Sequence, residues 1–401
     1  MDGWGTTIDW VVRMARIPAG DFLDEIATHN ALTPAILDAI ADEVAALHAR
    51  NPIIPTDQPE TLRRVADGNL RAAQQAGLDP TQLTAWRNGM QRHLARHDTA
   101  LRHRGKNGFV RRAHGDLHLG NMCLWQGAPV AFDALEFDED LATIDIGYDL
   151  AFLLMDLDVR VDRAAANRVM NRYPARTGDW ALVPLLPAWL AMRAMVRAHV
   201  EAARARPDES RRYLARALDY LHPPPPIVVA IGGLPGSGKS TVARALAPII
   251  GPAPGAVILR SDEIRKRQLN HAPEQRLPQS AYSAAASRAV FAEIATAAKA
   301  IATGGHAVIA DATFMDPAHR AAIAAAQPFL GKPFLGVWLD VPMAELERRV
   351  AARTGDASDA DLAVLRSAAR AGAGAGTWLA VDGTDTVAAV AAIRATLAIR
   401  L

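Results

Sequence analysis

The sequence is poor in cysteine and in long apolar runs, and both absences narrow what the chain can be. A single cysteine, Cys123, rules out an internal disulfide and favours a reducing compartment. No apolar run reaches the roughly 18 residues that a membrane-spanning helix needs. Residues 1–20 carry Asp, Arg and Trp where a secretory signal would have an apolar core. We therefore expect a cytoplasmic protein that does not enter a membrane.

A strong net charge is also absent. The 44 Lys and Arg residues nearly balance the 43 Asp and Glu residues, for a net charge of +1. This balance argues against a global field that attracts nucleic acid or an anionic membrane, and leaves local basic patches open. Lysine is rare, so Lys239 stands out, because arginine does not replace the compact ammonium group as a phosphate contact.

The chain length and one proline-rich segment predict two domains. The 401 residues are 50% apolar, enough for two domains that each have a core. One histidine and four prolines at 222–226 mark the boundary, because prolines stop a helix and favour a stiff spacer. The predicted units are therefore a mainly α domain over 1–221, a linker over 222–226, and an α/β domain over 227–401 with a parallel sheet and helices on both faces.

The expected elements follow from apolar periodicity. In the C-terminal domain, strands are expected at 227–231, 256–259, 306–310, 334–339 and 378–381. Helices are expected there at 240–250, 279–303, 317–326, 343–353 and 386–401, and the Ala-Gly stretch 368–376 is expected to be a loop. In the N-terminal domain we expect a strand within 7–17, helices at 22–27, 34–49, 59–76 and 81–103, β structure within 109–114 and 122–132, and helix from 144 to the prolines.

Residues 233–240 carry the clearest motif, Gly-Leu-Pro-Gly-Ser-Gly-Lys-Ser, which is a complete phosphate loop (Walker A) between a strand and a helix. Its glycines let backbone N–H groups surround a phosphate, and the helix start adds a positive end. Lys239 would contact the β and γ phosphates of ATP, and the Ser240 hydroxyl would hold Mg²⁺. The predicted ATP-binding residues are Gly233, Leu234, Pro235, Gly236, Ser237, Gly238, Lys239, Ser240 and Thr241.

Asp262 follows the second predicted strand of the C-terminal domain. Ligands bind beyond the carboxyl ends of strands in open α/β sheets, so this carboxylate is placed to accept a proton from an acceptor hydroxyl. The alternative is that Ser261 or Asp262 only caps the next helix. Arg265, one turn later, is predicted to bind an anionic acceptor, with a solvated helix face as the alternative.

Two further positions complete this predicted site. Asp311 ends the third strand, where phosphate-loop enzymes place an acidic residue that orients Mg²⁺. Arg349 and Arg353 are four residues apart and share a helix face. Such a helix can close over the nucleotide and bring an arginine to the transferred phosphoryl group, and Arg353 is the predicted catalytic residue. A charged face in solvent is the alternative.

On these residues, 227–401 resembles the small phosphate-loop kinases grouped with polynucleotide-kinase-like and zeta-toxin-like ATPases. The matching pieces are GLPGSGKS, RSDEIRK, VIADATF and ERRVAARTGDASDAD. The resemblance implies ATP-dependent phosphoryl transfer to a hydroxyl, with Asp262 as base and a lid arginine such as Arg353. It does not select the acceptor, because these kinases act on sugars, nucleosides, polynucleotide ends and other alcohols.

The N-terminal domain has a motif of its own, His-Gly-Asp-Leu-His-Leu-Gly-Asn, ending at Asn121 and followed by Asp133. The spacing fits phosphotransferase chemistry, in which Asp116 orients an acceptor hydroxyl while Asn121 and Asp133 hold Mg²⁺. The alternatives are a metal site through His114 and His118 and a purely structural polar loop.

These residues resemble the C-terminal lobe of the aminoglycoside-phosphotransferase and protein-kinase-like fold, over about residues 8–220. The resemblance implies Asp116 as base and Asn121 and Asp133 as metal ligands. That fold normally has a β-rich lobe with a lysine on ATP, whereas no lysine here precedes Lys106. Either the chain is a shortened gene product or this domain does not bind ATP in the family manner. The two-part arrangement resembles bacterial proteins that fuse a phosphotransferase-like domain to an ATP-binding kinase domain.

The sequence therefore predicts an ATP- and Mg²⁺-dependent kinase that acts on a small-molecule or nucleotide-like hydroxyl, with the chemistry in the C-terminal domain. The N-terminal domain would help to bind the acceptor or regulate the enzyme. One alternative is an ATP-binding switch that docks a protein partner. Another is a 5′-hydroxyl polynucleotide kinase, but the near-zero net charge and the absence of an aromatic and basic stripe in the C-terminal half argue against it.

Overall fold

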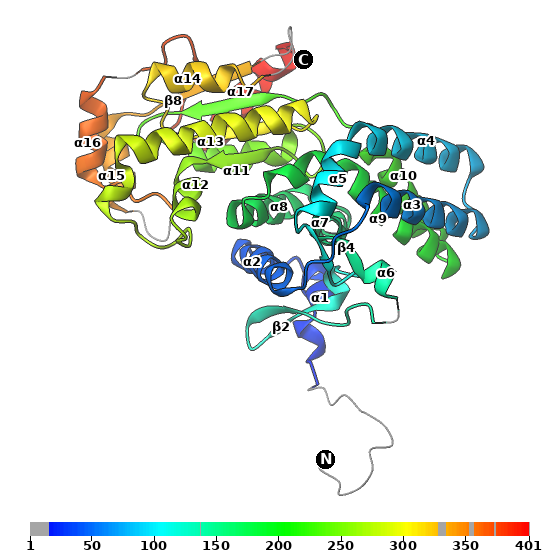
Figure 1. Ribbon diagram of the computed structural model, residues 1–401. Coiled ribbons are helices and arrows are strands. Elements are labelled where there is room, and N and C mark those ends of the chain that lie inside the picture. Colours follow the sequence, from blue (N-terminus) through cyan, green and yellow to red (C-terminus); the bar gives the residue numbers. More distant parts are fainter. Residues whose placement is uncertain (1–15, 137, 328–333, 353–356, 373, 401) are drawn as a thin grey trace, which may run out of the picture.

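A computed structural model of the chain describes residues 16–136, 138–327, 334–352, 357–372 and 374–400 (Figure 1). The strand expected within 7–17 falls almost wholly outside these ranges. Arg353 also lies outside the described residues.

The C-terminal half is built on a parallel sheet of five strands. These are β5 (Val228–Gly232), β6 (Val257–Arg260), β7 (Val308–Asp311), β8 (Phe334–Asp340) and β9 (Leu379–Asp382), in the spatial order β6-β7-β5-β8-β9. After β5 the chain builds one side of the sheet and then crosses to the other. The carboxyl end of β5 therefore lies at the switch point, where open α/β sheets bind ligands.

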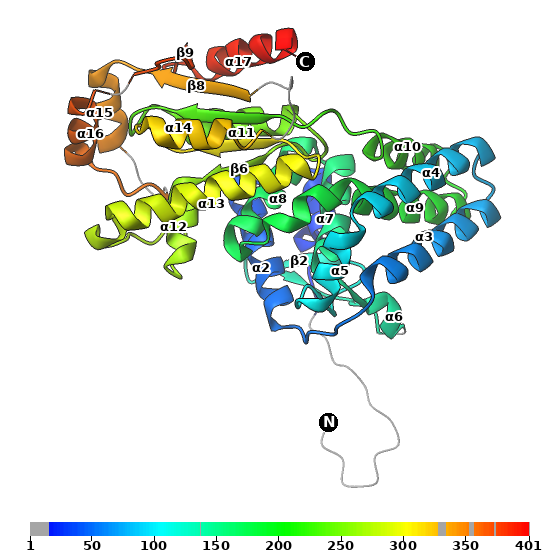
Figure 2. The ribbon, with the colours of Figure 1, turned by 45° about the horizontal axis from the view of Figure 1, so that its top comes forward.

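Helices cover both faces of this sheet (Figures 1 and 2), so the predicted α/β class is confirmed. Alternate strand residues point to opposite faces: Val229 and Ile231 pack with α11 and α17, while Val228 and Ala230 face the side of α13. The helices are α11 (Lys239–Leu246), α12 (Ser261–Gln268), α13 (Ala284–Thr303), α14 (Pro317–Ala324), α15 (Met343–Ala351), α16 (Leu362–Arg370) and α17 (Thr386–Arg400), with the 3₁₀ turns η4 (Ala247–Ile249) and η5 (Gln279–Tyr282).

Some boundaries differ from expectation. The helix expected at 240–250 is α11, which ends at Leu246 and continues as the 3₁₀ turn η4. The helix expected from 279 is α13, which begins only at Ala284, where the Ser283 side chain caps it. Helix α12 is missing from the list of expected elements, although the interpretation of Asp262 and Arg265 already assumed a helix there. Residues 368–370 close α16 instead of forming a loop, because Leu365 gives this helix a buried apolar residue to pack.

The N-terminal half is mainly helical, as predicted. Its order is η1 (Ala19–Asp21), α1 (Leu23–Thr28), α2 (Pro34–Arg50), α3 (Gln58–Gln75), α4 (Pro80–Arg96), α5 (Asp98–Lys106), β1 (Val110–Arg112), η2 (Leu119–Asn121), β2 (Met122–Trp125), β3 (Ala128–Ala131), α6 (Glu139–Ala142), β4 (Thr143–Asp145), α7 (Ile146–Arg160), α8 (Arg163–Thr177), η3 (Trp180–Leu185), α9 (Leu186–Ala203) and α10 (Pro207–Tyr220). Strands β1 and β4 pair antiparallel, as do β2 and β3. The helix expected over 81–103 is two helices that meet at His97.

One apolar cluster joins the two halves. It runs from Leu23 and Trp86 through Trp189 to Val228 and Phe314, so the N-terminal helices and one face of the sheet share a core. The expectation of a separate core for each domain is therefore not met on this face. The opposite face has its own cluster, with α11 and α17. Residues 222–226 form neither helix nor strand and connect α10 to β5.

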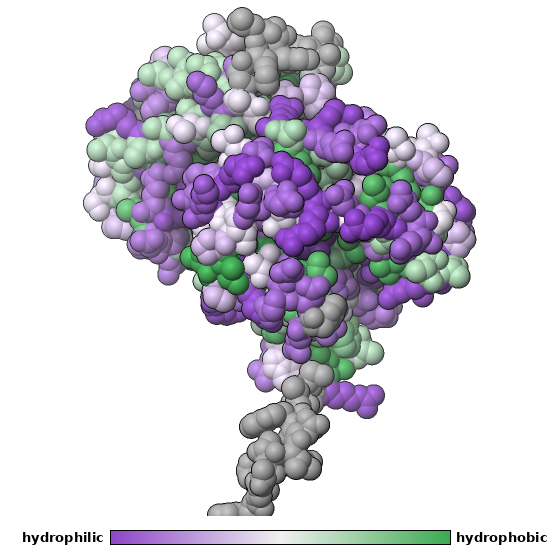
Figure 3. All heavy atoms as spheres, turned by 45° about the vertical axis from the view of Figure 1, so that its right-hand side comes forward, coloured by the Kyte–Doolittle hydropathy of each residue, from purple (hydrophilic) through white to green (hydrophobic). Residues whose placement is uncertain are grey.

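Among the residues that the structure describes, one stretch, Trp180–Ala203, is long and apolar enough to cross a membrane, but 78% of its apolar window is buried inside the protein. This burial is what a core helix shows. The face of the molecule in Figure 3 is largely hydrophilic, with apolar patches separated by polar side chains.

Candidate active site

The phosphate loop joins β5 to α11 at the switch point of the sheet. Gly236 has φ 85° and Gly238 has φ 88°, backbone conformations that side chains rarely adopt. A Cβ at Gly236 would lie 3.0 Å from the Leu346 carbonyl oxygen. The turn therefore requires glycine at both positions, and it delivers Lys239 as the first residue of α11.

Lys239 lies over its own loop. Its ammonium group donates hydrogen bonds of 3.0 Å to the carbonyl oxygens of both Gly233 and Leu234. The Ser237 side chain is 1% exposed, and its hydroxyl has no hydrogen-bond partner among the described residues. The loop thus holds one cation and one unpartnered buried hydroxyl at the position where the motif predicts phosphate.

Ser240 and Asp311 meet beside the loop. The Ser240 hydroxyl donates a 2.6 Å hydrogen bond to Oδ2 of Asp311, which ends β7 and is 2% exposed. The guanidinium Nε of Arg260 lies 3.6 Å from the same carboxylate oxygen. A hydroxyl and a carboxylate side by side offer the oxygen ligands that Mg²⁺ prefers, so these residues fit the predicted ion.

The part of the chain that the structure describes holds no second candidate metal site built from side chains alone. Within the described ranges, no group of three or more His, Cys, Asp or Glu side chains could hold a metal ion. Mg²⁺ in phosphate-transfer enzymes needs only one or two protein ligands, because water and the phosphates supply the rest.

Asp262 lies in the first turn of α12, half-buried, on the cavity wall. The N-cap of α12 is Arg260, so neither Ser261 nor Asp262 serves as this cap. Burial raises the pKa of Asp262, the charges of Arg260 and Lys239 lower it, and Asp311 raises it, for a net shift above the ordinary value. The carboxyl group thus belongs to one charged cluster with the loop lysine and Asp311.

Arg265 does not lie on a solvated face. It is 7% exposed, donates a 2.8 Å hydrogen bond to the Ala281 carbonyl oxygen, and stacks over the Tyr282 ring at 4.8 Å from the centroid. Lys266 pairs with Asp359 at 3.1 Å and Arg267 pairs with Glu293, whereas Arg265 forms no ion pair with any described carboxylate. Since an unpaired buried charge is costly, Arg265 is suited to an anionic ligand.

One cavity of about 830 Å³ gathers these residues. Lys239, Ser240, Asp262, Arg265 and Asp311 all line it, so the structure brings together predicted residues from three separate segments. Its lining residues all lie between 235 and 386, within the C-terminal half. Of the predicted loop residues, Pro235, Gly236, Gly238 and Thr241 also line the cavity.

Of the two candidate lid arginines, Arg349 lies within the described residues and Arg353 lies outside them. Arg349 lines the cavity and donates to the carbonyl oxygens of Gly383 at 3.0 Å and Thr384 at 2.8 Å, and to Glu345 at 2.6 Å. It therefore fixes α15 to the segment that follows β9. The role of Arg353 stays a prediction.

Asp359 is a site residue that the sequence reasoning missed. It accepts hydrogen bonds from Lys266 at 3.1 Å, from the Tyr282 hydroxyl at 2.7 Å and from the Leu277 amide at 2.9 Å. It thus fastens the segment before α16 to α12 and to the loop after it. Nothing in the acidic run around it distinguishes this aspartate in the sequence.

The N-terminal motif forms a compact loop around Asp116. The Asn121 amide donates to Oδ2 of Asp116 at 2.9 Å, and His118 Nε2 lies 3.5 Å from the same oxygen. Burial acts to raise the pKa of Asp116, but hydrogen bonding to His118 and the charge of Arg193 hold it below its ordinary value. Asp116 is thus kept as a carboxylate.

Two buried side chains outside the motif, Asp149 and Arg193, fix this loop by hydrogen bonds to its backbone. Asp149 of α7 is fully buried and accepts hydrogen bonds from the backbone amides of His114 at 3.0 Å and Gly115 at 2.9 Å, and from His48 at 3.1 Å. Arg193 of α9 donates to the Gly115 carbonyl oxygen at 3.0 Å. The nearby apolar pattern of α7 and α9 gave no sign that these polar residues were anchors.

The backbone brings the two predicted metal ligands, Asn121 and Asp133, near each other, and their metal role stays a prediction. The Phe132 amide donates to the Asn121 carbonyl oxygen at 3.0 Å, which brings the exposed Asp133 next to the loop. His114 Nε2 contacts the Phe132 carbonyl oxygen at 2.8 Å and His118 Nδ1 accepts from Gly120, so both rings are engaged with the backbone. These contacts weigh against the rival histidine metal site.

A β-rich lobe does not appear in the described part of the chain before α7. That part has only β1 to β4, each of three or four residues. Lys106, the last residue of α5, is exposed. No lysine of this described part forms a hydrogen bond or an ion pair with Asp116.

Comparisons with known proteins agree with both motif sets. Residues 10–186 match the family model described as "Phosphotransferase enzyme family", and residues 228–372 match one described as "AAA domain". Uncharacterised proteins of Mycobacterium tuberculosis and Mycobacterium bovis are 34% identical over 227 residues. The match covers 54% of this chain and 45% of each relative, so the chain spans about half the length of these relatives.

Solved structures are similar at a lower level. A gluconokinase from Sinorhizobium meliloti is 20% identical, with 44% of this chain and 97% of that chain covered and a TM-score of 0.29. Kti12 of Chaetomium thermophilum, solved with ADP-AlF3, is 16% identical over 42% and 98%, with a TM-score of 0.30. A Plasmodium vivax ethanolamine kinase is 10% identical over 48% and 60%, with a TM-score of 0.33. Similarity this low identifies no acceptor.

The chain therefore joins two kinase-like regions, one that matches the phosphotransferase enzyme family and one that matches an AAA domain, which confirms the two-part arrangement predicted from its motifs.

Proposed function

We propose that the protein is a cytoplasmic, ATP- and Mg²⁺-dependent kinase whose chemistry takes place in the C-terminal region, over residues 227–401. The observation that carries the proposal is the common cavity of Lys239, Ser240, Asp262 and Asp311. It is lined by a phosphate loop at one end and by a carboxylate with a raised pKa near it. This combination suits transfer of a phosphoryl group to a hydroxyl.

In the proposed reaction, the acceptor hydroxyl oxygen attacks the γ-phosphorus of ATP. The bond to the bridging oxygen of ADP breaks, and the hydroxyl proton passes to the Asp262 carboxylate. Lys239 leaves its loop carbonyl partners and contacts the β and γ phosphates. Mg²⁺ held by Ser240 and Asp311 would neutralise the phosphate charge, and Arg353 or Arg349 would stabilise charge on the transferred group.

The acceptor is proposed to be a small molecule or nucleotide-like alcohol that carries an anionic group. Arg265 supports this, since it is a buried cation on the cavity wall without an ion pair to a described carboxylate. A nucleic acid end is less well supported, because the net charge is only +1. The N-terminal region over 1–221, joined by the linker 222–226, is proposed to support acceptor binding or regulation rather than to bind its own ATP.

The deciding experiment is untargeted mass spectrometry of a metabolite extract incubated with the protein, ATP and Mg²⁺. We expect one metabolite to gain a phosphate, and we expect the Lys239→Ala protein to leave that metabolite unchanged. ATP hydrolysis with no phosphorylated product in the extract, together with nucleotide-dependent capture of a protein, would support the switch instead. Transfer from γ-labelled ATP to oligonucleotide 5′ ends would support the polynucleotide kinase.

A further inference from the structure

Helix α8 of the N-terminal region takes the place of a missing neighbour strand at the edge of the sheet. Strand β6 is an edge strand, and its outward backbone groups would otherwise lack partners. The Asn171 side chain accepts from the Ile258 amide at 2.6 Å and donates to the Ala256 carbonyl oxygen at 3.2 Å. Asn167, one turn earlier, donates to the same carbonyl at 3.1 Å. A helix side chain thus satisfies both groups.

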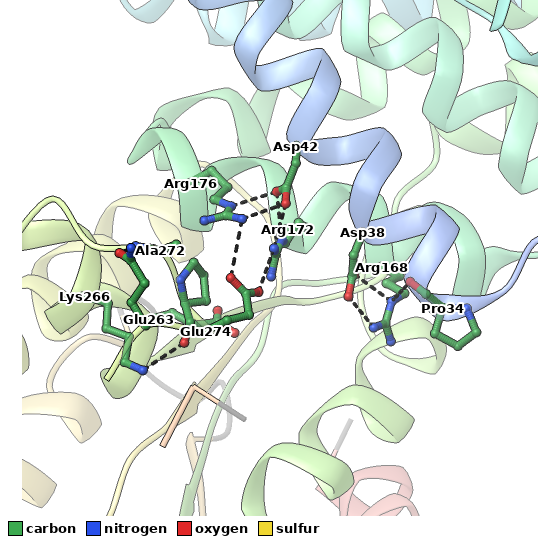
Figure 4. A network of polar contacts seen from close by, with 12 residues as sticks. Pro34, Asp38, Asp42, Arg168, Arg172, Arg176, Glu263, Lys266, Ala272 and Glu274 are labelled. Carbon is green, nitrogen blue, oxygen red and sulfur yellow. Dashed lines mark hydrogen bonds and ion pairs between the residues drawn. The ribbon is translucent and has the colours of Figure 1, made fainter. Parts of the chain in front are cut away.

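The same helix makes a second attachment, to Glu274 in the loop that follows α12 (Figure 4). Arg172 and Arg176 both hold Asp42 of α2 at 2.6 to 2.8 Å, and both also reach Glu274, at 2.9 and 3.7 Å. Burial acts to raise the pKa of Glu274, but its hydrogen bond to Arg172 holds it below the ordinary value. Glu274 is therefore an ionised link between the two regions.

The two attachments bracket the acceptor side of the cavity. Asn171 fixes β6 just before α12, which carries Asp262 and Arg265, and Glu274 fixes the loop just after it. Two residues past Glu274, the loop contributes Arg276 and Leu277 to the cavity wall. The phosphate loop, in contrast, is positioned by β5 and α11 within the sheet domain itself.

We propose that α8 is a positioning element for the acceptor side of the cavity, with Asn171, Arg172 and Glu274 as its positioning residues. This inference rests on the proposed function, in which α12 carries the acceptor contacts. A shift of α8 would move Asp262 and the 274–277 wall relative to the phosphate loop. The N-terminal region would thereby set acceptor affinity while leaving nucleotide affinity unchanged, without contributing a residue to the cavity.

The structural test compares hydrogen exchange in the full chain for Asn171→Ala, Glu274→Gln and a matched control, Asp38→Asn. Asp38 pairs with Arg168 of α8 at 2.6 Å, so the control breaks an ion pair of the same helices that does not reach the sheet domain. We expect Asn171→Ala to speed exchange in residues 257–283 by roughly ten- to a hundredfold, because a buried amide loses its partner. Glu274→Gln, a change at a half-exposed side chain, should give about a twofold to fivefold effect there.

Faster exchange confined to 257–283 in the first two variants supports the inference, provided that the control stays like the wild type. No change in both variants, or an equal change in all three, overturns it. This readout needs no acceptor, so it decides the positioning role even where no phosphorylated product is found and the kinase proposal fails.

The functional test separates the two substrates once the extract experiment has identified the acceptor. We expect both variants to raise the KM for the acceptor severalfold while the affinity for a fluorescent ADP analogue stays that of the wild type. A parallel loss of ADP affinity would show a general loss of stability and contradict the inference. Asp38→Asn should change neither quantity.

Discussion

The Ser240 hydroxyl and the Asp311 carboxylate are 71 residues apart in sequence, yet they form a 2.6 Å hydrogen bond beside the phosphate loop. The pairing follows from topology, because β5 and β7 are adjacent parallel strands and their carboxyl ends meet at one edge. Two oxygen ligands, one from the end of β7 and one from the helix that follows β5, thus come to one point. This arrangement gives the first test of the metal prediction.

We expect Ser240→Ala and Asp311→Asn each to raise the Mg²⁺ concentration needed for half-maximal turnover, by roughly tenfold. Their effects should not add in the double variant, because both residues act on one ion. Asp316→Asn, which changes a capping residue of α14 to another good capping residue, serves as the control. Additive effects of the two site variants would argue against a shared ion.

Lys239→Ala should weaken ATP binding and lower turnover by on the order of a hundredfold or more, because the loop loses its phosphate cation. Titration with a fluorescent ATP analogue and steady-state turnover measure the two effects. Lys299→Ala, at an exposed position of α13, should leave both unchanged. Wild-type turnover in the Lys239 variant would refute the kinase proposal.

Asp262→Asn should keep ADP affinity and lower phosphoryl transfer by about a hundredfold to ten-thousandfold, since the general base is removed. The base works deprotonated, and burial raises the pKa of Asp262. Wild-type transfer should therefore rise with pH through a pKa above the ordinary aspartate value of 3.8. Asp262→Glu should recover part of the rate, whereas a flat profile on the acid side would contradict the role of Asp262 as base.

Asp116→Asn and Asp133→Asn should leave ATP turnover unchanged. Neither residue lines the cavity of the C-terminal half, and Asp116 is engaged by Asn121 within its own loop. Turnover of the purified variants with ATP and the identified acceptor is the measurement. A large loss of turnover with both variants would show that the N-terminal motif takes part in the chemistry.

The buried His306 should make the folding stability of the protein fall at acid pH. This residue is fully buried, and burial lowers its pKa from 6.5 to about 4. Above pH 6.5 the His306 ring is neutral in the folded and in the unfolded state. Between pH 6.5 and about 4, the ring is protonated in the unfolded chain but stays neutral in the folded protein. Stability should therefore fall as the pH drops from about 6.5 to about 4, by up to roughly 3 kcal/mol from this residue. Thermal unfolding across this range should show a smaller fall for His306→Gln than for the wild type.

Strands and motifs of the C-terminal half were predictable because each carries a local signal. The apolar run around Val228–Gly232 and the glycine pattern behind it fix both β5 and the loop. The exact helix ends were not, since η4 and the late start of α13 depend on packing and on the Ser283 cap. Apolar periodicity did not reveal helix α12, which was assumed only from its capping residues, because its charged sequence has Ile264 as its one buried apolar residue.

The predicted site residues of the phosphate loop and the strand ends could be named because their chemistry is tied to spacing. Asp149, Arg193 and Asp359 could not, because each acts through partners far away in the sequence. Nor does any local pattern reveal that Asn171 would pair with the backbone of Ile258, 87 residues later. Such long-range polar contacts appear only once the helices are packed.

The shared apolar core has a consequence for how the protein unfolds. Because one cluster extends from the N-terminal helices onto the sheet, neither half can open its side of the contact without exposing apolar surface of the other. The two regions should melt in a single cooperative transition. A chain cut at the prolines would leave the β5–β7 face uncovered and prone to aggregation.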